Sequence, residues 1–155
     1  MQKKEFKIVL MAPEIPGNTG SVGRTCVALG LELILIKPYG FDLSEKAVRR
    51  AGLDYWKHVP LKEYENWDDF LKHESPKEEH LLFFENNVDQ NFYDAPYSDD
   101  CYLIFGSETK GLPKSFYTNH KNQMYHLPMF SEHIRSLNLS NTVTSVAYEC
   151  LRCLN

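Results

Sequence analysis

The sequence lacks any hydrophobic run long enough to cross a bilayer and lacks an excess of basic residues. Its 17 Lys and Arg are outnumbered by 21 Asp and Glu, giving a formal net charge of −4. The N-terminal apolar stretch, Phe6 to Met11, is too short for a signal peptide and is followed at once by Pro13-Glu14. We therefore expect a cytoplasmic protein with no membrane partner. The acidic balance counts against a generally basic nucleic-acid-binding surface, although a local basic patch would still serve.

Two common nucleotide-binding signatures are also missing. Gly17, Gly20 and Gly23 are spaced G-x-x-G-x-x-G, whereas the dinucleotide fingerprint requires G-x-G-x-x-G and an acidic residue after the second strand. Here that strand is followed by Lys37-Pro38, which cannot accept a hydrogen bond from a ribose hydroxyl. The loop Gly106–Gly111 is not followed by Gly-Lys-Ser/Thr, so it does not form a P-loop. NAD-binding and ATP-binding folds are poorly supported.

Cysteines are few, and their spacing does not favour a metal site. In a cytoplasmic protein the four cysteines are expected to be free. Two of them form a C-x-x-C pair near the C-terminus, but no second Cys/His pair occurs at zinc spacing. We expect no metal cofactor. The cysteines are Cys26, Cys101, Cys150 and Cys153.

Short apolar runs alternate with amphipathic segments along the whole chain, and no repeat or linker interrupts them. This alternation predicts an α/β fold, a mostly parallel sheet flanked by helices, in one domain spanning residues 1–155. We expect strands at 6–11, 33–36, near 56–59, 81–84, 102–105 and 124–127. We expect helices from about Ser21 to Gly30, at 44–52, 67–73, 114–119 and 139–154.

Two strand ends in the last third are followed by loops rich in Gly, Ser and Asn. Tyr102–Phe105 leads into Gly106–Pro113, and Met124–Pro128 leads toward Ile134–Asn141. Ligands of open α/β sheets bind at the carboxyl ends of strands. Such loops let backbone groups approach a purine and ribose closely with few charges, which favours a nucleoside-like cofactor. The alternative for the Ser and Asn residues of 136–141 is helix N-capping.

Basic residues at two places in the sequence could bind an anionic partner. Arg24 lies near the start of a helix, where the helix dipole disfavours a cation, so an anionic partner would explain it. Lys46, Arg49 and Arg50 form one edge with Lys57 and His58 nearby. Such a cluster is either a solvated helix face or a set of phosphate contacts.

Three ordered motifs carry a resemblance to a known family. They are Asn18-Thr19-Gly20-x-x-x-Arg24, Phe105-Gly106-x-Glu108-Thr109-x-Gly111-Leu112-Pro113 and Arg135-Ser136-Leu137-Asn138-Leu139-Ser140-Asn141. Together they resemble the motifs of the SPOUT-class RNA 2′-O-methyltransferases. The string Arg49-Arg50-Ala51-Gly52-Leu53-Asp54-Tyr55 narrows the resemblance to the small bacterial tRNA (cytidine/uridine-34-2′-O)-methyltransferases.

The resemblance implies a C-terminal deep trefoil knot, a homodimer, S-adenosylmethionine as cofactor and the tRNA anticodon stem-loop as partner. It implies a set of cofactor-binding residues, namely Phe84, Gly106, Leu127, Ser136 and Asn141. It implies Arg24 and Asn18 as catalytic residues, contributed by the same or the other subunit. It implies RNA contacts from Arg24, Arg49, Arg50, Lys110 and Tyr148. Lys110 departs from close relatives, which often carry Arg there.

The implied reaction is methylation of the ribose 2′-hydroxyl of nucleotide 34. Because a guanidinium stays protonated, we expect Arg24 to bind a phosphate and orient the hydroxyl rather than to act as a base. Two alternatives remain open at this point. One is 2′-O-methylation of another RNA such as rRNA, and the other is a non-catalytic nucleotide-binding regulator.

Overall fold

The computed structural model describes residues 3–44, 46, 48 and 53–155. Within this part of the chain, seven strands form one sheet in the order β3-β2-β1-β6-β4-β7-β5, and every neighbouring pair is parallel. The strands are β1 (Lys7–Met11), β2 (Leu33–Ile36), β3 (Leu61–Tyr64), β4 (Leu81–Phe84), β5 (Gln90–Asn91), β6 (Tyr102–Phe105) and β7 (Met124–His126). The predicted α/β class with a parallel sheet is confirmed.

The central strands are apolar throughout because both of their faces are buried. All four residues of each of β2, β4 and β6 are buried. Successive side chains of a strand point to opposite faces, so Ile8 and Leu10 join one core cluster and Val9 joins the other. Each face therefore needs a cover of helices.

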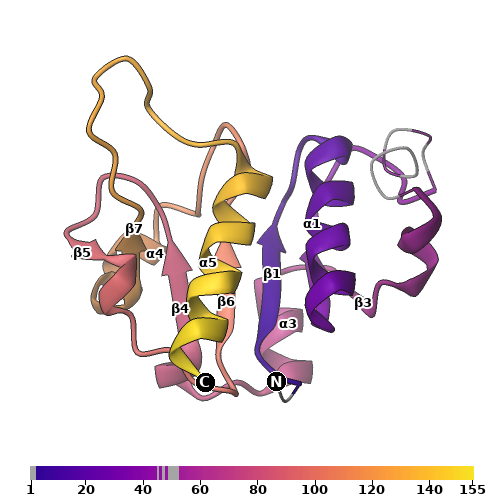
Figure 1. Ribbon diagram of the computed structural model, residues 1–155, viewed down its shortest axis with the longest axis horizontal. Helices are drawn as coiled ribbons and strands as arrows, with labels where there is room; N and C mark the ends of the chain where they lie inside the picture. The colour runs from indigo at the N-terminus through magenta and orange to yellow at the C-terminus, as the bar shows by residue number, and fades with distance from the viewer. Residues whose placement is uncertain (1–2, 45, 47, 49–52) are drawn as a thin grey trace.

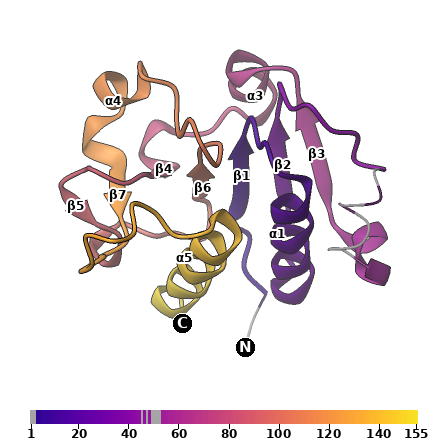
Figure 2. The same cartoon turned by 90° about the horizontal axis from the view of Figure 1, so that it is seen from above.

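Helices lie on both faces of the sheet (Figure 2). On one side lie α1 (Pro16–Leu29) and α5 (Leu139–Cys153), which contact each other. The predicted apolar stripe of α5 is confirmed, with Val143, Val146 and Cys150 fully buried. On the other side lie α3 (Trp67–Glu74) and α4 (Phe116–Asn119). The chain leaves β7, crosses through residues 127–138 and returns as α5 in front of β4 and β6 (Figure 1).

The first helix begins five residues earlier than predicted. It starts at Pro16 rather than near Ser21, and it ends as predicted before Gly30, which adopts φ 68°. Proline favours the first turn of a helix for two reasons. A backbone N–H, which proline lacks, would have no partner within the helix there, and the fixed φ of proline is already helical. Pro16, Gly17 and Asn18 therefore form the first turn of α1, and Arg24 lies in the middle of the helix and not, as the sequence had suggested, near its start.

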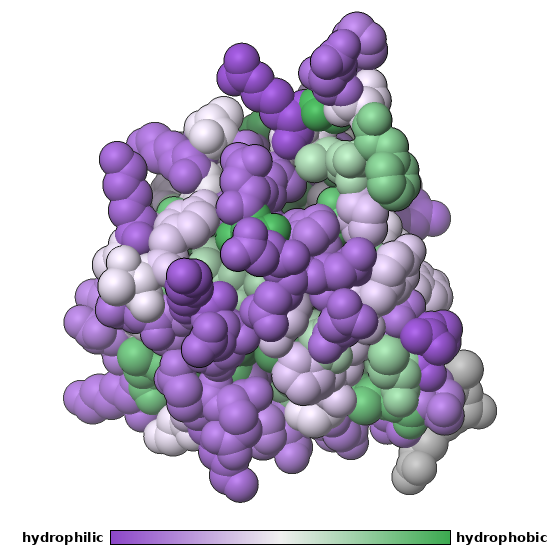
Figure 3. Space-filling model, turned by 90° about the vertical axis from the view of Figure 1, so that its left-hand side faces the viewer, coloured by the Kyte–Doolittle hydropathy of each residue, from purple (hydrophilic) through white to green (hydrophobic). Residues whose placement is uncertain are grey.

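One further prediction needs correction. Residues 56–59 are not a strand, because Leu53–His58 form a 3-10 helix and the strand is β3 instead. The polar segment 88–100 contains the two-residue strand β5 and the 3-10 helix Phe92–Asp94. β3 and β5 are the edge strands, where polar side chains are accepted, and the β5 side of the molecule is mostly hydrophilic (Figure 3).

The remaining predicted helices are found with shifted ends. The helix expected at 67–73 extends to Glu74, the one expected at 114–119 begins at Phe116, and the last one ends at Cys153. Of the helix expected at 44–52, residues 45, 47 and 49–52 lie outside the described residues.

A buried carboxylate ties α3 to the sheet. The Glu74 side chain is 6% exposed and lies 3.3 Å from Lys62 Nζ. It accepts hydrogen bonds from the hydroxyls of Tyr64 and Tyr102, the latter at 2.9 Å. Burial alone raises the pKa of Glu74, but these hydrogen bonds and the charge of Lys62 outweigh it, so the pKa is lowered overall.

We predict that Glu74→Gln lowers the free energy of unfolding by about 1–3 kcal/mol at pH 7, because charge-assisted hydrogen bonds are lost. The lowered pKa means that this stabilisation is present above the unfolded-state pKa and is lost as the pH falls through the folded-state pKa. The difference between variant and wild type in urea denaturation should therefore shrink below about pH 4. Glu65→Gln, at a side chain 74% exposed, is the control and should change stability little. A deficit that stays constant down to the lowest pH would contradict the charge-based explanation.

Candidate functional site

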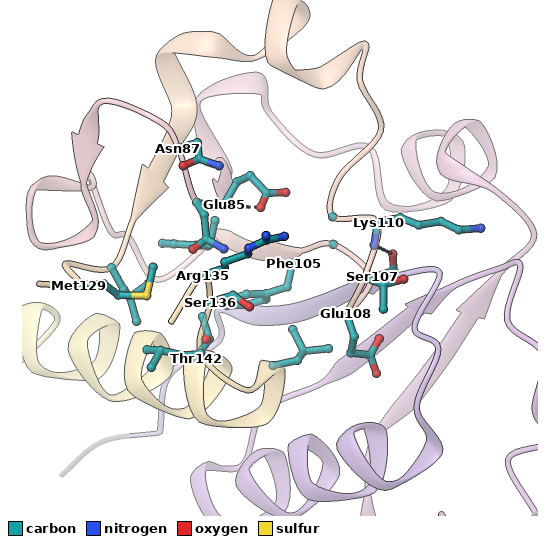
Figure 4. A pocket seen from close by; sticks show the side chains of 18 of the residues that line it. Glu85, Asn87, Phe105, Ser107, Glu108, Lys110, Met129, Arg135, Ser136 and Thr142 are labelled. Atoms are coloured by element: carbon teal, nitrogen blue, oxygen red, sulfur yellow. Dashed lines mark hydrogen bonds between the residues drawn. The ribbon is translucent and has the colours of Figure 1, made fainter. Parts of the chain in front are cut away.

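A cavity of about 330 Å³ opens at the carboxyl ends of the central strands (Figure 4). It lies where the loops after β4, β6 and β7 meet the start of α5, at the edge expected for ligand binding in such sheets. Its lining residues are Phe84, Glu85, Asn86, Asn87, Phe105, Gly106, Ser107, Glu108, Thr109, Lys110, Gly111, Tyr117, Leu127, Met129, Arg135, Ser136, Leu137, Leu139 and Thr142. Segments separated by about 50 residues in sequence thus form one site.

The floor of the cavity is apolar and tightly built. The rings of Phe84 and Phe105 stack with their centroids 5.1 Å apart. A side chain at Gly106 would place its Cβ 2.2 Å from the backbone carbon of Gly111. Ser107 and Gly111 exchange backbone hydrogen bonds of 3.2 and 3.0 Å, and Gly111 has φ 69°. Both glycines are therefore needed for the turn that forms one wall.

An acidic side chain that the sequence did not reveal forms another wall. The Glu85 carboxylate accepts hydrogen bonds from the backbone N–H groups of Leu112 and Asn86, each at 3.0 Å. Burial, together with the charge of Glu85 and a hydrogen bond to it, raises the pKa of the Tyr117 hydroxyl. No sequence motif marks Glu85, but its position directly after β4 was a usable signal.

Two carboxylates join the loop before α1 to the loop after β6. The Glu108 carboxylate accepts hydrogen bonds from the backbone N–H groups of Glu14 and Ile15, both at 2.8 Å. The Glu14 carboxylate in turn accepts from the backbone N–H of Thr109 at 3.0 Å and from its hydroxyl at 2.8 Å. The bond from the Thr109 N–H is the largest contribution that lowers the pKa of Glu14. The two loops therefore hold each other by reciprocal charge-assisted hydrogen bonds.

Asn18 extends this connection to α5. Its Nδ2 lies 3.3 Å from Glu108 Oε2 and donates to it, and its Oδ1 accepts from Asn138 Nδ2 at 3.1 Å. The Asn138 Oδ1 accepts from the backbone N–H groups of Ser140 and Asn141, so Asn138 is the N-cap of α5. The capping alternative is thus confirmed for Asn138, whereas Ser136 lines the cavity.

The other residues implied by the resemblance are distributed as follows. Lys110 lines the cavity, and Asn141 is not among its lining residues. Arg24 is exposed on α1, with its guanidinium carbon 5.0 Å from the centre of the Tyr55 ring, and does not line the cavity either. Tyr148 is 51% exposed on α5. Arg49 and Arg50 lie outside the described residues.

One cation of the cavity was not predicted as a site residue. Arg135 lines the cavity beside Ser136, and Figure 4 shows its side chain near that of Glu85. It belongs to the motif Arg135–Asn141, so the motif itself carried the signal. With Glu85, Glu108 and Lys110 it gives the cavity two groups of each charge.

Among the described residues, no group of three or more His, Cys, Asp or Glu side chains is arranged to hold a metal ion. The four cysteines are free, and Cys153 is exposed while the other three are buried. No helix in the described part of the chain is long and apolar enough to span a membrane.

We predict that Glu108→Gln loosens the two loops, because an amide offers one acceptor oxygen in place of two. The amide protons of Glu14 and Ile15 should exchange with solvent faster in hydrogen–deuterium exchange, while those of β2 stay protected. Glu132→Gln is the matched control, since Glu132 is exposed in the 127–138 segment. Unchanged exchange at Glu14 and Ile15 would show that the Glu108 carboxylate does not hold the loop.

Known proteins resemble this chain in both sequence and fold. The SpoU rRNA Methylase family profile matches residues 5–148. A tRNA (cytidine(34)-2′-O)-methyltransferase of Burkholderia cenocepacia is 42% identical over 148 residues, which cover 95% of this chain and 94% of that protein. A structure described as giving insight into 2′-OH methylation of C/U34 on tRNA is 38% identical, covers 97% of both chains and has a TM-score of 0.86.

A more distant structure shares the fold. AviRb of Streptomyces viridochromogenes, a SpoU methyltransferase in complex with the cofactor AdoMet, is 22% identical with a TM-score of 0.84. That alignment covers 99% of this chain and 62% of AviRb. The match of the family profile over most of the chain, together with the 42% identity, confirms the resemblance drawn from the motifs. The chain belongs to the SpoU rRNA methylase family.

Proposed function

We propose that this protein transfers a methyl group from S-adenosylmethionine to the ribose 2′-hydroxyl of the wobble nucleotide, cytidine or uridine 34, in the tRNA anticodon loop. The observation that carries the proposal is the convergence of Phe84, Gly106, Leu127 and Ser136 on one cavity. The relatives named for C34 and C/U34 methylation, which cover nearly the whole chain, support this choice of RNA.

The cavity residues fit the proposed cofactor. Phe84 and Leu127 offer apolar surface to an adenine ring, and Ser136 offers a hydroxyl. Gly106 and Gly111 both line the cavity and have no side chain, so this wall offers its backbone groups to a ligand. When bound, S-adenosylmethionine supplies an electrophilic methyl group on a positively charged sulfur. The Glu85 carboxylate would favour a cation in this cavity.

The chain's own contribution to the reaction is mainly positioning, which can lower a barrier by several kcal/mol. Arg24 would bind a phosphate next to the target ribose and orient its hydroxyl, because a guanidinium is a poor base. Asn18, held between Glu108 and Asn138, would position α1 rather than touch the reacting atoms. Lys110 and Arg135 would attract the RNA backbone to the mouth of the cavity.

The proposal includes a homodimer. Arg24 is absent from the lining of its own chain's cavity and lies against Tyr55 instead. A second copy that brings its Arg24 to this cavity would complete the site. We further propose that the single domain carries the family's trefoil knot, formed where residues 127–138 and α5 pass the loops of β4 and β6, and that it works in the cytoplasm. Tyr148, exposed on α5, would contact the RNA or the second subunit.

We predict that the purified protein transfers labelled methyl groups from S-adenosylmethionine to bulk tRNA from a strain that lacks the gene. Nucleoside mapping should place the label in a 2′-O-methyl nucleotide at position 34. Label at another position of the tRNA would show a different target nucleotide with the same reaction. Cofactor binding without transfer to any RNA would favour the nucleotide-binding regulator.

We predict that mixing two inactive variants restores activity if Arg24 acts across the dimer. Arg24→Ala would lack the phosphate contact, and Gly106→Ala would lack the cofactor site. A mixed dimer has one site with both an intact cofactor cavity and an intact partner arginine. Activity should rise to a substantial fraction of the wild-type rate after the subunits are exchanged, as measured by methyl transfer to tRNA.

Arg152→Lys serves as the control for the loss of a guanidinium, because Arg152 pairs with Glu149 at the far end of α5. Arg24→Lys should lose turnover, because an ammonium cannot reproduce the planar fork of the guanidinium. Full turnover of Arg24→Lys with unchanged RNA affinity would argue against a specific guanidinium role. Mixtures that stay inactive although mixed dimers form would place Arg24 in its own subunit's site.

A further inference from the structure

A second cavity, of about 380 Å³, adjoins the first. Asn86, Asn87, Leu127 and Met129 line both, so the two cavities share a wall. The second cavity lies between the loop after β4, strand β5 and the start of the 127–138 segment. Its lining residues are Asn86, Asn87, Val88, Asn91, His126, Leu127, Pro128, Met129 and Phe130.

The lining of this cavity is about half polar and half apolar, and it contains no Lys, Arg, Asp or Glu side chain among the described residues. The side-chain amides of Asn86 and Asn87 belong to its lining, and Asn87 is exposed. His126 has a buried Nδ1 without a partner. Asn91 uses its Oδ1 to accept from the Tyr93 N–H at 2.9 Å, which leaves its Nδ2 available. Unpaired polar groups around one hollow indicate a neutral ligand rich in donors and acceptors.

An aromatic ring stands at the rim. Phe130 is 99% exposed, an unfavourable state for so large an apolar side chain. Figure 3 shows apolar side chains at the top of this otherwise hydrophilic side, where the 127–138 segment lies. A free aromatic face beside amide side chains is the combination that proteins use to stack and read an unpaired nucleobase.

We propose that this second cavity receives the base of the nucleotide whose ribose is methylated. The inference rests on the proposed function and extends it to base selection. The cavity joins the first one through a shared wall, as a base must lie next to the ribose that faces the methyl donor. The absence of charge suits a neutral base and not a phosphate. Phe130 stacks on the base, while Asn91 Nδ2 donates to its hydrogen-bonding edge.

The test for stacking uses anticodon stem-loops with cytidine or uridine at position 34. Phe130→Ala should lower kcat/KM about tenfold, and Phe130→Trp should keep it within about twofold of the wild type. Cofactor affinity without RNA, measured by calorimetry, should not change, because Phe130 does not line the first cavity. Ile134→Ala is the matched control, since Ile134 is 55% exposed in the same segment and lines neither cavity.

The test for base reading is Asn91→Asp. This change keeps the Oδ1 that accepts from Tyr93 and replaces one donor by an acceptor, so the local fold is preserved. The ratio of kcat/KM on the cytidine and uridine stem-loops should change by about fivefold or more. Asn122→Asp, at an exposed residue outside the cavity, introduces the same charge and should leave the ratio unchanged.

Each outcome supports or overturns the inference. Equal losses in Phe130→Ala and Ile134→Ala, or a loss that accompanies dissociation into monomers in light scattering, would assign the surface to a second copy of the chain. An active wild type whose Phe130 and Asn91 variants behave normally would overturn the base cavity and leave the proposed function intact. A wild type that methylates neither stem-loop would overturn both.

Discussion

The site depends on the exchange of carboxylates between the loop before α1 and the loop after β6. The Glu108 carboxylate accepts hydrogen bonds from the backbone N–H groups of Glu14 and Ile15, just before α1. The Glu14 carboxylate accepts a hydrogen bond from the backbone N–H of Thr109. Each interaction is a charge-assisted bond to a backbone donor, among the stronger polar contacts available to a protein. Since Asn18 and Asn138 continue the chain of contacts to α5, three segments far apart in sequence are held in one geometry.

The parallel sheet explains why this geometry forms a cavity at all. Parallel strands deliver all of their carboxyl ends to one edge, and β6 and β7 flank β4 although both follow it in the chain. The loops after these strands therefore crowd together, and a Cβ at Gly111 after β6 would lie 2.5 Å from Glu85 Oε2 after β4. The cavity that remains combines backbone and aromatic surfaces with charged side chains, so both shape and charge bear on which ligand fits there.

Strands with both faces buried were predicted correctly from the sequence, whereas strands at the edge of the sheet were missed. Strands such as Leu33–Ile36 were predicted with the correct ends because both faces are buried and every residue is apolar. The edge strand Leu61–Tyr64 was missed because its central Lys62 and Glu63 are exposed. Glu85 was missed because its role depends on the N–H of Leu112, 27 residues away. Contacts between distant loops leave no periodic signal in a sequence.

The acidic net charge is compatible with an RNA substrate once the carboxylates are placed. Glu14, Glu74 and Glu108 each accept several hydrogen bonds within the fold, which leaves these carboxylates fewer free acceptor sites. The side chains at the cavity mouth that could meet a phosphate are cations, Lys110 and Arg135. The formal charge of −4 counts all of these groups equally, whereas an approaching RNA responds to the local field. Carboxylates such as Glu14 and Glu108 thus hold the loops together, while the cations Lys110 and Arg135 are the groups that could attract RNA.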